Sequence, residues 1–333
     1  MTDSFRYWPK TDKDWKSLED LRSAFVSGHG GDQTYFNNRR LLELYDATFA
    51  RRIAAKWRWV LSELDAIGWT PAPGALLDWG CGSGVASREV LNKYSQSLDA
   101  LYLLDRSKLA CEFAREEVRL NNQQIKILDR EPQNLSLQLL SHVMSEIDDS
   151  QLDQLCSKIS AQSIIWIEPG SKQESRRLGA ARQRLIERGY NVVAPCFHQK
   201  SCELLESGHK ADWCHFFAKP LPEFFGDQRW RDLADRLKLD LYVLPVSFMV
   251  LDRRPVPTYP SNLVRVIGSY RRGKAHYMLT GCNQAGITEC RFSQRSNKQT
   301  YKDIDKAKIS TRQLWTLEQS EITAIQDYKS STD

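Results

Sequence analysis

Residues 76–84 read Leu-Leu-Asp-Trp-Gly-Cys-Gly-Ser-Gly, which places Asp78 just before three glycines at alternate positions, Gly80, Gly82 and Gly84. The apolar run before them predicts a short strand over residues 75–79, and the residues after them, Val85–Tyr94, have helical character. Glycine lets a backbone approach a ligand closely where a side chain would collide. A strand, a glycine loop and a helix in this order predict the opening unit of an α/β fold.

A second carboxylate lies at the end of the next predicted strand. Asp105 follows Leu101–Leu104, 21 residues after Gly84, where it could accept hydrogen bonds from both ribose hydroxyls of a nucleoside. A dinucleotide site would favour G-x-G-x-x-G around a pyrophosphate, whereas Gly-x-Gly-x-Gly after Asp78 suits a nucleoside without phosphates. The alternative is a plain strand-to-helix turn, with Asp105 as a helix N-cap.

Further alternation of strands and helices predicts a parallel, doubly wound sheet. An N-terminal helical region precedes it, from about residue 35, with Lys56 on a basic outer face; Pro71 and Pro73 then mark a linker. Beyond the sheet we expect a cysteine-rich segment, a β-rich extension and a polar tail with a weak helical pattern at 314–325. The predicted divisions are 1–72, 73–195, 196–235, 236–295 and 296–333, and the predicted core elements are Leu109–Asn121, Ser163–Ile167, Arg176–Arg188, Asn191–Ala194, Leu239–Leu251, Leu263–Tyr270 and Ala275–Cys282.

Composition excludes several classes of protein. The chain has 333 residues, of which 41 % are hydrophobic and 10 % aromatic, so it is neither disordered throughout nor a low-complexity fibre. No apolar run approaches the roughly 18 residues of a membrane-spanning helix, and no secretory signal is expected. The net charge is +5, but residues 265–308 hold ten Lys and Arg against three Asp and Glu. Such a basic segment fits either nucleic acid or a solvated surface.

Three of the eight cysteines are close together in the sequence: Cys196, Cys202 and Cys214. In a reducing compartment, clustered cysteines indicate metal binding rather than disulfides. Zinc or an iron–sulfur cluster needs a fourth ligand. From the residues alone the candidates are Cys282, Cys290, His198 and His215.

Two methyltransferase signatures are missing or misplaced. At the position of the Asn/Asp-Pro-Pro-aromatic run of many amino-methylating enzymes stand residues 141–146, Ser-His-Val-Met-Ser-Glu. The pair Pro195-Cys196 is similar to the Pro-Cys of cytosine-carbon methyltransferases, but it comes late in the chain and beside other cysteines. The sequence therefore identifies no catalytic residue.

Residues 78–84 resemble motif I of class I S-adenosylmethionine-dependent methyltransferases. Together with Glu168-Pro169-Gly170, the run from Pro195 to Cys202 and the run Asp212-Trp213-Cys214-His215-Phe216, they resemble one family, the Rsm22-like small ribosomal subunit methyltransferases. That family includes bacterial proteins and methyltransferase-like assembly factors of the mitochondrial small subunit. The resemblance covers about residues 35–295.

The resemblance implies a Rossmann-like fold that binds S-adenosylmethionine through Asp78, Gly80, Cys81, Gly82, Gly84 and Asp105. It implies a 4Fe-4S cluster on Cys196, Cys202, Cys214 and Cys282, with Cys290 as the fallback ligand and zinc as the alternative metal. It also implies binding to small-subunit ribosomal RNA, for which Arg271, Arg272 and Lys274, on a predicted β turn, are the leading contacts.

Three functions follow as hypotheses: an rRNA methyltransferase, a ribosome assembly factor that transfers no methyl group, and a small-molecule methyltransferase with a zinc knuckle. The first two imply a protein that is monomeric away from the ribosome and does not bind membranes. They place it in a bacterial cytoplasm, or in the mitochondrial matrix if it is eukaryotic; the absence of a basic amphipathic presequence favours the former.

Overall fold

The computed structural model describes residues 5–27, 36, 38–209, 211–306 and 310–328. The chain divides into two compact units. Unit 1 comprises residues 1–65, 70–169 and 217–246, and unit 2 comprises 66–69, 170–216 and 247–333. Among the described residues, no helix is both long and apolar enough to span a bilayer.

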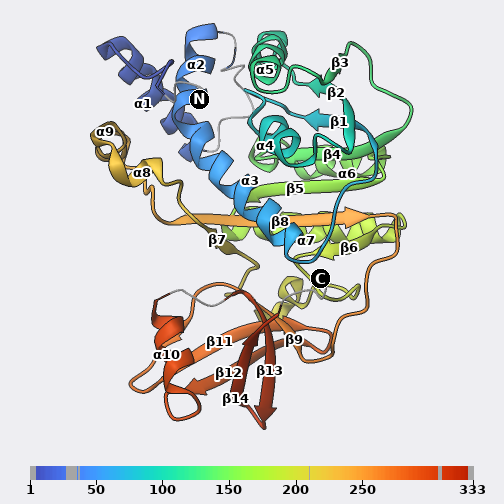
Figure 1. The fold of residues 1–333 in the computed structure, drawn as a ribbon, viewed down its shortest axis with the longest axis vertical. Coiled ribbons are helices and arrows are strands. Elements are labelled where there is room, and N and C mark those ends of the chain that lie inside the picture. Colours follow the sequence, from blue (N-terminus) through green and yellow to red (C-terminus); the bar gives the residue numbers. More distant parts are fainter. Residues whose placement is uncertain (1–4, 28–35, 37, 210, 307–309, 329–333) are drawn as a thin grey trace. The chain divides into compact units, whose positions relative to one another are not determined.

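Unit 1 contains a parallel sheet with the strand order β3-β2-β1-β4-β5. Its central strands are buried along almost their whole length because helices cover both faces of such a sheet; six of the seven residues of β4 and of β5 are buried. This confirms the predicted parallel α/β arrangement (Figure 1). The strands are β1 (Gly74–Trp79), β2 (Leu98–Leu104), β3 (Lys126–Leu128), β4 (Leu135–Ser141) and β5 (Ser163–Pro169).

The helices of unit 1 follow the amphipathic pattern of the sequence. The predicted helix 85–94 is confirmed with the same bounds, and the predicted helix 109–121 begins one residue earlier, after the N-cap Ser107. The described part of the N-terminal helical region contains three helices, and the predicted start near Tyr35 lies outside the described residues. The helices are α1 (Asp12–Ser27), α2 (Arg39–Ala47), α3 (Phe49–Asp65), α4 (Val85–Tyr94), α5 (Lys108–Asn121), α6 (Asp149–Lys158), α8 (Glu223–Gly226) and α9 (Gln228–Leu237).

Unit 2 begins with a helix and a strand and continues through the cysteine-rich loop. Strand β6 pairs with β8 in antiparallel fashion. Strands β7 and β8 each cross the boundary between the two units along the chain. The elements are α7 (Lys172–Glu187), β6 (Asn191–Ala194), β7 (Phe216–Ala218), β8 (Leu244–Asp252), β9 (Leu263–Val266), β10 (Arg271–Arg272), β11 (His276–Asn283), β12 (Gly286–Ser293), α10 (Lys298–Asp305), β13 (Arg312–Glu318) and β14 (Glu321–Asp327).

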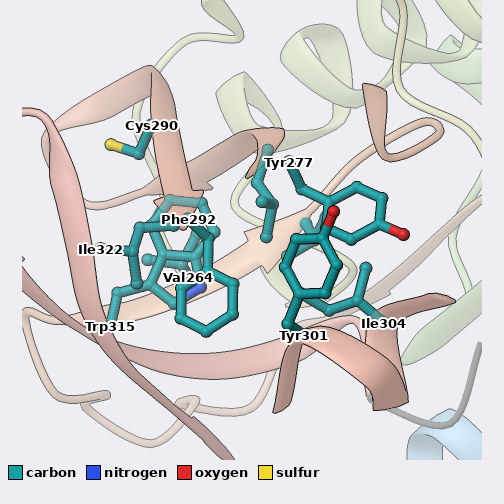
Figure 2. Close-up of a cluster of buried hydrophobic side chains, with 10 residues drawn as sticks. Val264, Tyr277, Cys290, Phe292, Tyr301, Ile304, Trp315 and Ile322 are labelled. Carbon is teal, nitrogen blue, oxygen red and sulfur yellow. The ribbon is translucent and has the colours of Figure 1, made fainter. Parts of the chain in front are cut away.

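The C-terminal strands form a second sheet in the order β10-β11-β12-β14-β13-β9, and β9 pairs with β11 as well. The pairing of β9 with both β13 and β11 closes five of these strands into a barrel. Buried side chains fill it, and residues from α10 join them (Figure 2). This core comprises Val264, Val266, Tyr277, Leu279, Cys290, Phe292, Tyr301, Ile304, Trp315 and Ile322.

The prediction of a polar tail with helical character at 314–325 is wrong. Those residues lie in the β13–β14 hairpin, and residues 298–305 form α10. Trp315 and Ile322 are buried in the barrel, while Thr316, Glu318, Gln326 and Asp327 of the same hairpin are exposed. A barrel strand needs one apolar face only, so its average composition resembles that of a solvated tail.

Candidate functional site

The glycine loop between β1 and α4 requires glycine at each of its three positions. Gly80, Gly82 and Gly84 have φ angles of 74°, 50° and 77°, in the left-handed region that other residues avoid. A Cβ atom on Gly84 would lie 2.9 Å from the Cβ of Ala114, and one on Gly80 would lie 2.8 Å from Val143 Cγ1. The loop is therefore shaped both by its backbone angles and by close packing.

Asp78 is completely buried at the end of β1. Its Oδ2 accepts hydrogen bonds from Ser87 Oγ at 2.6 Å and from the Ser87 amide at 3.2 Å. Its Oδ1 has no hydrogen-bond partner among the described residues. Burial raises the pKa of Asp78 to about 6, against the lowering effect of the two Ser87 bonds. A buried carboxylate oxygen without a hydrogen-bond partner costs free energy. Such groups are typical of sites that bind a cation or a hydrogen-bond donor.

Asp105 connects the ends of the first two strands. Its Oδ2 accepts a hydrogen bond from the Gly82 amide at 2.9 Å, and its Oδ1 accepts one from the Ser107 amide at 2.9 Å. The helix N-cap is Ser107, not Asp105. The carboxylate thus holds the glycine loop, and each oxygen keeps a lone pair for a further donor.

A cavity of about 530 Å³ lies beside this loop, within the range of small-molecule sites. Arg106 and Glu146 form an ion pair at 2.9 Å among its lining residues. Apolar side chains from α6 and polar groups from the ends of β1 and β2 line it together. The main contributors are Trp79, Gly80, Leu104, Asp105, Val143, Gln151, Leu155 and Ile159.

Cys81 is buried in the loop, and its Sγ lies 4.0 Å from Cys111 Sγ on α5. Two cysteines that are 30 residues apart in the sequence therefore lie close together beside the glycine loop. Both are free thiols.

Four cysteines line one small cavity of about 30 Å³ in unit 2. Cys196 and Cys202 come from the loop after β6, Cys214 comes just before β7, and Cys282 comes from β11. All four are free thiols. Burial raises the pKa of Cys214 well above its ordinary value, and the neighbouring Cys196, Cys202 and Cys282 raise it further. The fold therefore brings the four predicted ligands together.

The other candidate ligands lie elsewhere, with one exception. Cys290 is buried as a member of the barrel core, and His215 stacks on Trp213 with ring centroids 4.6 Å apart. His198 lines the cysteine cavity, and its Nε2 lies 3.3 Å from Cys282 Sγ. Within the described part of the chain, no group of three or more His, Cys, Asp or Glu side chains has a geometry that could hold a metal ion.

Two buried arginines act on these thiols. Arg182 donates hydrogen bonds to the carbonyl oxygens of His198 and Lys200, and its charge lowers the pKa of Cys282 against the larger effect of burial. Arg265 is 1 % exposed, with its guanidinium over the Phe197 ring at 4.9 Å and bonded to the Pro195 carbonyl at 3.0 Å. Sequence reasoning counted Arg265 in a basic RNA-binding segment; its burial excludes that role. A single sequence shows no sign that these two arginines are buried.

The sequence also did not predict a buried polar cluster at the end of β4. Lys56 Nζ lies 3.2 Å from His142 Nε2, and Trp57 Nε1 donates to Ser141 Oγ at 3.0 Å. His142 has a φ of 57°, which is strained for this residue type. Lys56 is 8 % exposed, so its placement on an outer basic face is wrong. The pKa of Lys56 is lowered to about 7, mainly by burial and further by the nearby charge of Arg52.

Lys56→Met is expected to stabilise the protein by up to about 5 kcal/mol at pH 7 or below. The unfolded lysine binds its proton up to a pH near 10.5, while the folded one loses it near 7, so wild-type stability should rise between these values. Urea unfolding at pH 6.5 and 9.5 checks this, with the exposed Lys108→Met as the control. An advantage of Lys56→Met that stays constant between the two pH values would contradict it.

The predicted RNA contacts lie on the barrel. Arg271 and Arg272 form the two-residue strand β10 rather than a turn, and Lys274 follows in the connection to β11. All three are exposed. Arg271 forms an ion pair with Glu289 of β12. Lys308, at the end of the predicted basic segment, falls outside the described residues.

The glycine loop, the parallel sheet and the carboxylates at its strand ends define an α/β protein of the Rossmann-like methyltransferase type. The family model described as "Mitochondrial small ribosomal subunit Rsm22" matches residues 45–312, and the chain belongs to that family. A comparison with curated proteins gives no match.

Several solved structures are similar at a low level. One is the magnesium protoporphyrin IX methyltransferase of Synechocystis with bound S-adenosylhomocysteine, at 11 % identity and a TM-score of 0.35, covering 72 % of this chain and 100 % of that one. Another is the plantazolicin methyltransferase, at 12 % identity and a TM-score of 0.38, covering 72 % and 98 %. Neither bears on the substrate of this chain.

Proposed function

We propose that this chain is an S-adenosylmethionine-binding, methyltransferase-like protein that acts on or binds small-subunit ribosomal RNA during ribosome assembly and carries a 4Fe-4S cluster. The family match supports the ribosomal part. The main support for the cluster is that four cysteines from three segments line one cavity, although they are up to 86 residues apart in the sequence. We further propose that the protein is a monomer away from the ribosome and works in a bacterial cytoplasm or a mitochondrial matrix.

The residues proposed to hold the cofactor are Asp78, Gly80, Cys81, Gly82, Gly84 and Asp105. The bare glycine backbone lets the methionine part approach, and the buried Asp78 beneath it, whose Oδ1 has no partner among the described residues, would attract its ammonium group. Asp105 keeps lone pairs for the ribose hydroxyls while it orients the loop through the Gly82 amide. When bound, S-adenosylmethionine would supply an electrophilic methyl group.

The residues proposed to hold the cluster are Cys196, Cys202, Cys214 and Cys282. Four thiols are a donor set typical of iron–sulfur clusters, and of zinc; His198 and Glu203 line the same cavity. A 4Fe-4S cluster would need four cysteine sulfurs around one shared space, and these four cysteines line one cavity. Arg182 and Arg265 would offset part of its negative charge. Its role would be to fasten the loop after β6 to β11.

Transfer of a labelled methyl group to immature small ribosomal subunits tests the proposed activity. Wild-type protein should label rRNA, and Asp78→Ala should lower the labelling at least tenfold because it removes the carboxylate beneath the glycine loop. Filter binding of the same rRNA measures the binding function separately, and there Asp78→Ala should match the wild type. An absence of specific rRNA binding would overturn the ribosomal proposal.

A second candidate is an assembly factor of the same fold that transfers no methyl group. One observation favours it: at the end of β4, Ser141 and His142 are engaged with Trp57 and Lys56 inside the protein. Assembly activity that survives Asp78→Ala, with no label transferred by the wild type, would select this candidate.

A further inference from the structure

The barrel of unit 2 has a recognisable strand order. Along the chain, the five barrel strands are β9, β11, β12, β13 and β14, which we count as the first to the fifth. Around the barrel, neighbouring strands follow the order β9-β11-β12-β14-β13, and β13 pairs with β9 again. The spatial order is therefore first, second, third, fifth, fourth. The third and fifth strands, β12 and β14, are parallel, and the other neighbouring pairs are antiparallel. Helix α10 connects the third strand to the fourth, and its Tyr301 and Ile304 join the barrel core (Figure 2). This is the topology of an OB-fold, a class of small barrel that binds oligonucleotides across its second and third strands.

The outer face of these strands carries a matched row of side chains. Met278 of β11 lies directly opposite Arg271 on one side and Arg291 on the other. Tyr277 and Leu279, the neighbours of Met278 in β11, are buried in the core, so Met278 belongs to the outer face. Arg271 and Arg291 are exposed. An apolar thioether between two guanidinium groups offers a stacking surface with phosphate-binding charge at Arg291, while Arg271 is ion-paired with Glu289 of the same face.

Positive charge gathers on one side of this face. The connection from the first to the second strand contains Arg271, Arg272 and Lys274, and in an OB-fold this loop borders the binding surface. The hairpin between the fourth and fifth strands is short and acidic, with Glu318 and Glu321 at its ends. A ligand with a phosphate backbone is therefore attracted to the β10 side and away from the hairpin.

We infer that the outer face of β10, β11 and β12 is an OB-type site for an unpaired segment of RNA. The bases of a single strand can stack on Met278 and on the arginine planes, whereas paired bases in an A-form helix are out of reach of side chains on such a face. This inference rests on the proposed RNA-binding function and names the form of RNA bound.

The experiment compares full-length wild type with Lys274→Ala/Arg291→Ala and with the control Lys298→Ala/Lys302→Ala. All four side chains are exposed, and the control pair makes the same charge change on α10. The probes are a labelled oligouridine of about 12 nucleotides, within the length range that one OB-fold covers, and the same strand annealed to oligoadenosine. Binding is measured by anisotropy between 50 and 200 mM salt, and circular dichroism verifies folding.

The wild type should bind the single strand at least tenfold more tightly than the duplex. The face variant should lose roughly tenfold in affinity, and its salt slope should fall by about 1.4 for two lost contacts to a single strand. The control should change affinity less than threefold. A preference for the duplex, or equal losses in the two variants, would overturn the inference. Binding of small-subunit rRNA is measured in parallel: rRNA binding that is unaffected by the face variant rejects this site alone, while no rRNA binding rejects the proposed function too.

Discussion

Replacing Cys282 with serine is expected to lower the iron and acid-labile sulfide content of anaerobically purified protein at least tenfold, from about four of each per chain. Cys282 is the proposed ligand on β11, and the other three cysteines lie in the cysteine-rich loop and just before β7. Without Cys282, only three of the four proposed cysteine ligands remain for the cluster. Iron, sulfide and zinc assays, together with the visible absorbance of the cluster, measure the effect.

Cys290→Ser is the matched control because it makes the same substitution on the neighbouring strand. Cys290 is 2 % exposed within the barrel core, so its loss should cost roughly 1–2 kcal/mol of stability and leave the metal content unchanged. If Cys290→Ser lost the iron while Cys282→Ser kept it, the ligand assignment would be wrong. Zinc in place of iron in the wild type would reject the cluster itself.

Asp78→Asn is expected to have two effects of opposite sign. The folded pKa of Asp78, about 6, exceeds the ordinary 3.8, so wild-type stability should fall as the pH rises from 3.8 to about 6, where the unfolded chain has lost the proton that the folded chain keeps. The neutral amide should therefore stabilise the unliganded protein at pH 7.5, by at most about 3 kcal/mol. It should also weaken S-adenosylmethionine binding at least tenfold, because the carboxylate beneath the glycine loop is gone.

Urea unfolding at pH 4.5 and 7.5 and calorimetric titration with the cofactor measure the two effects. The gain in stability should fall by about two thirds at pH 4.5, where the folded Asp78 is protonated while the unfolded side chain is still largely ionised. The control is Asp99→Asn, which makes the same change at an exposed position of β2 and should alter neither quantity. Unchanged cofactor affinity in Asp78→Asn would contradict the assigned role of the carboxylate.

Local patterns predicted the cofactor region well. Residues 74–94 form a strand, a loop and a helix with nearly the predicted bounds because the three glycines permit one kind of turn. The first three cysteines were equally visible, since they fall within 19 residues. The sequence did not distinguish the fourth cysteine, because Cys282 and Cys290 lie on paired strands. Only the strand register shows that Cys282 faces the cavity and that Cys290 belongs to the barrel core.

Long-range pairing and burial account for the errors. The β13–β14 hairpin turns at Gln319 and Ser320, and Gln319 adopts a φ of 56° where glycine or asparagine is the usual signal. Lys56 was placed on a solvated face because helical periodicity does not reveal what later packs against it. The closure of the barrel depends on strands far apart in the chain, which no local pattern records.

Strand β11 has one further consequence. Met278 and Cys282 lie four residues apart on the same side of this strand, so the proposed RNA surface and the proposed metal ligand share one rigid element. RNA binding and metal binding are then thermodynamically linked. If bound metal changes the affinity for RNA by some factor, bound RNA changes the affinity for the metal by the same factor. A ribosome precursor that held this protein more tightly in its loaded form would, by the same factor, protect the metal from loss.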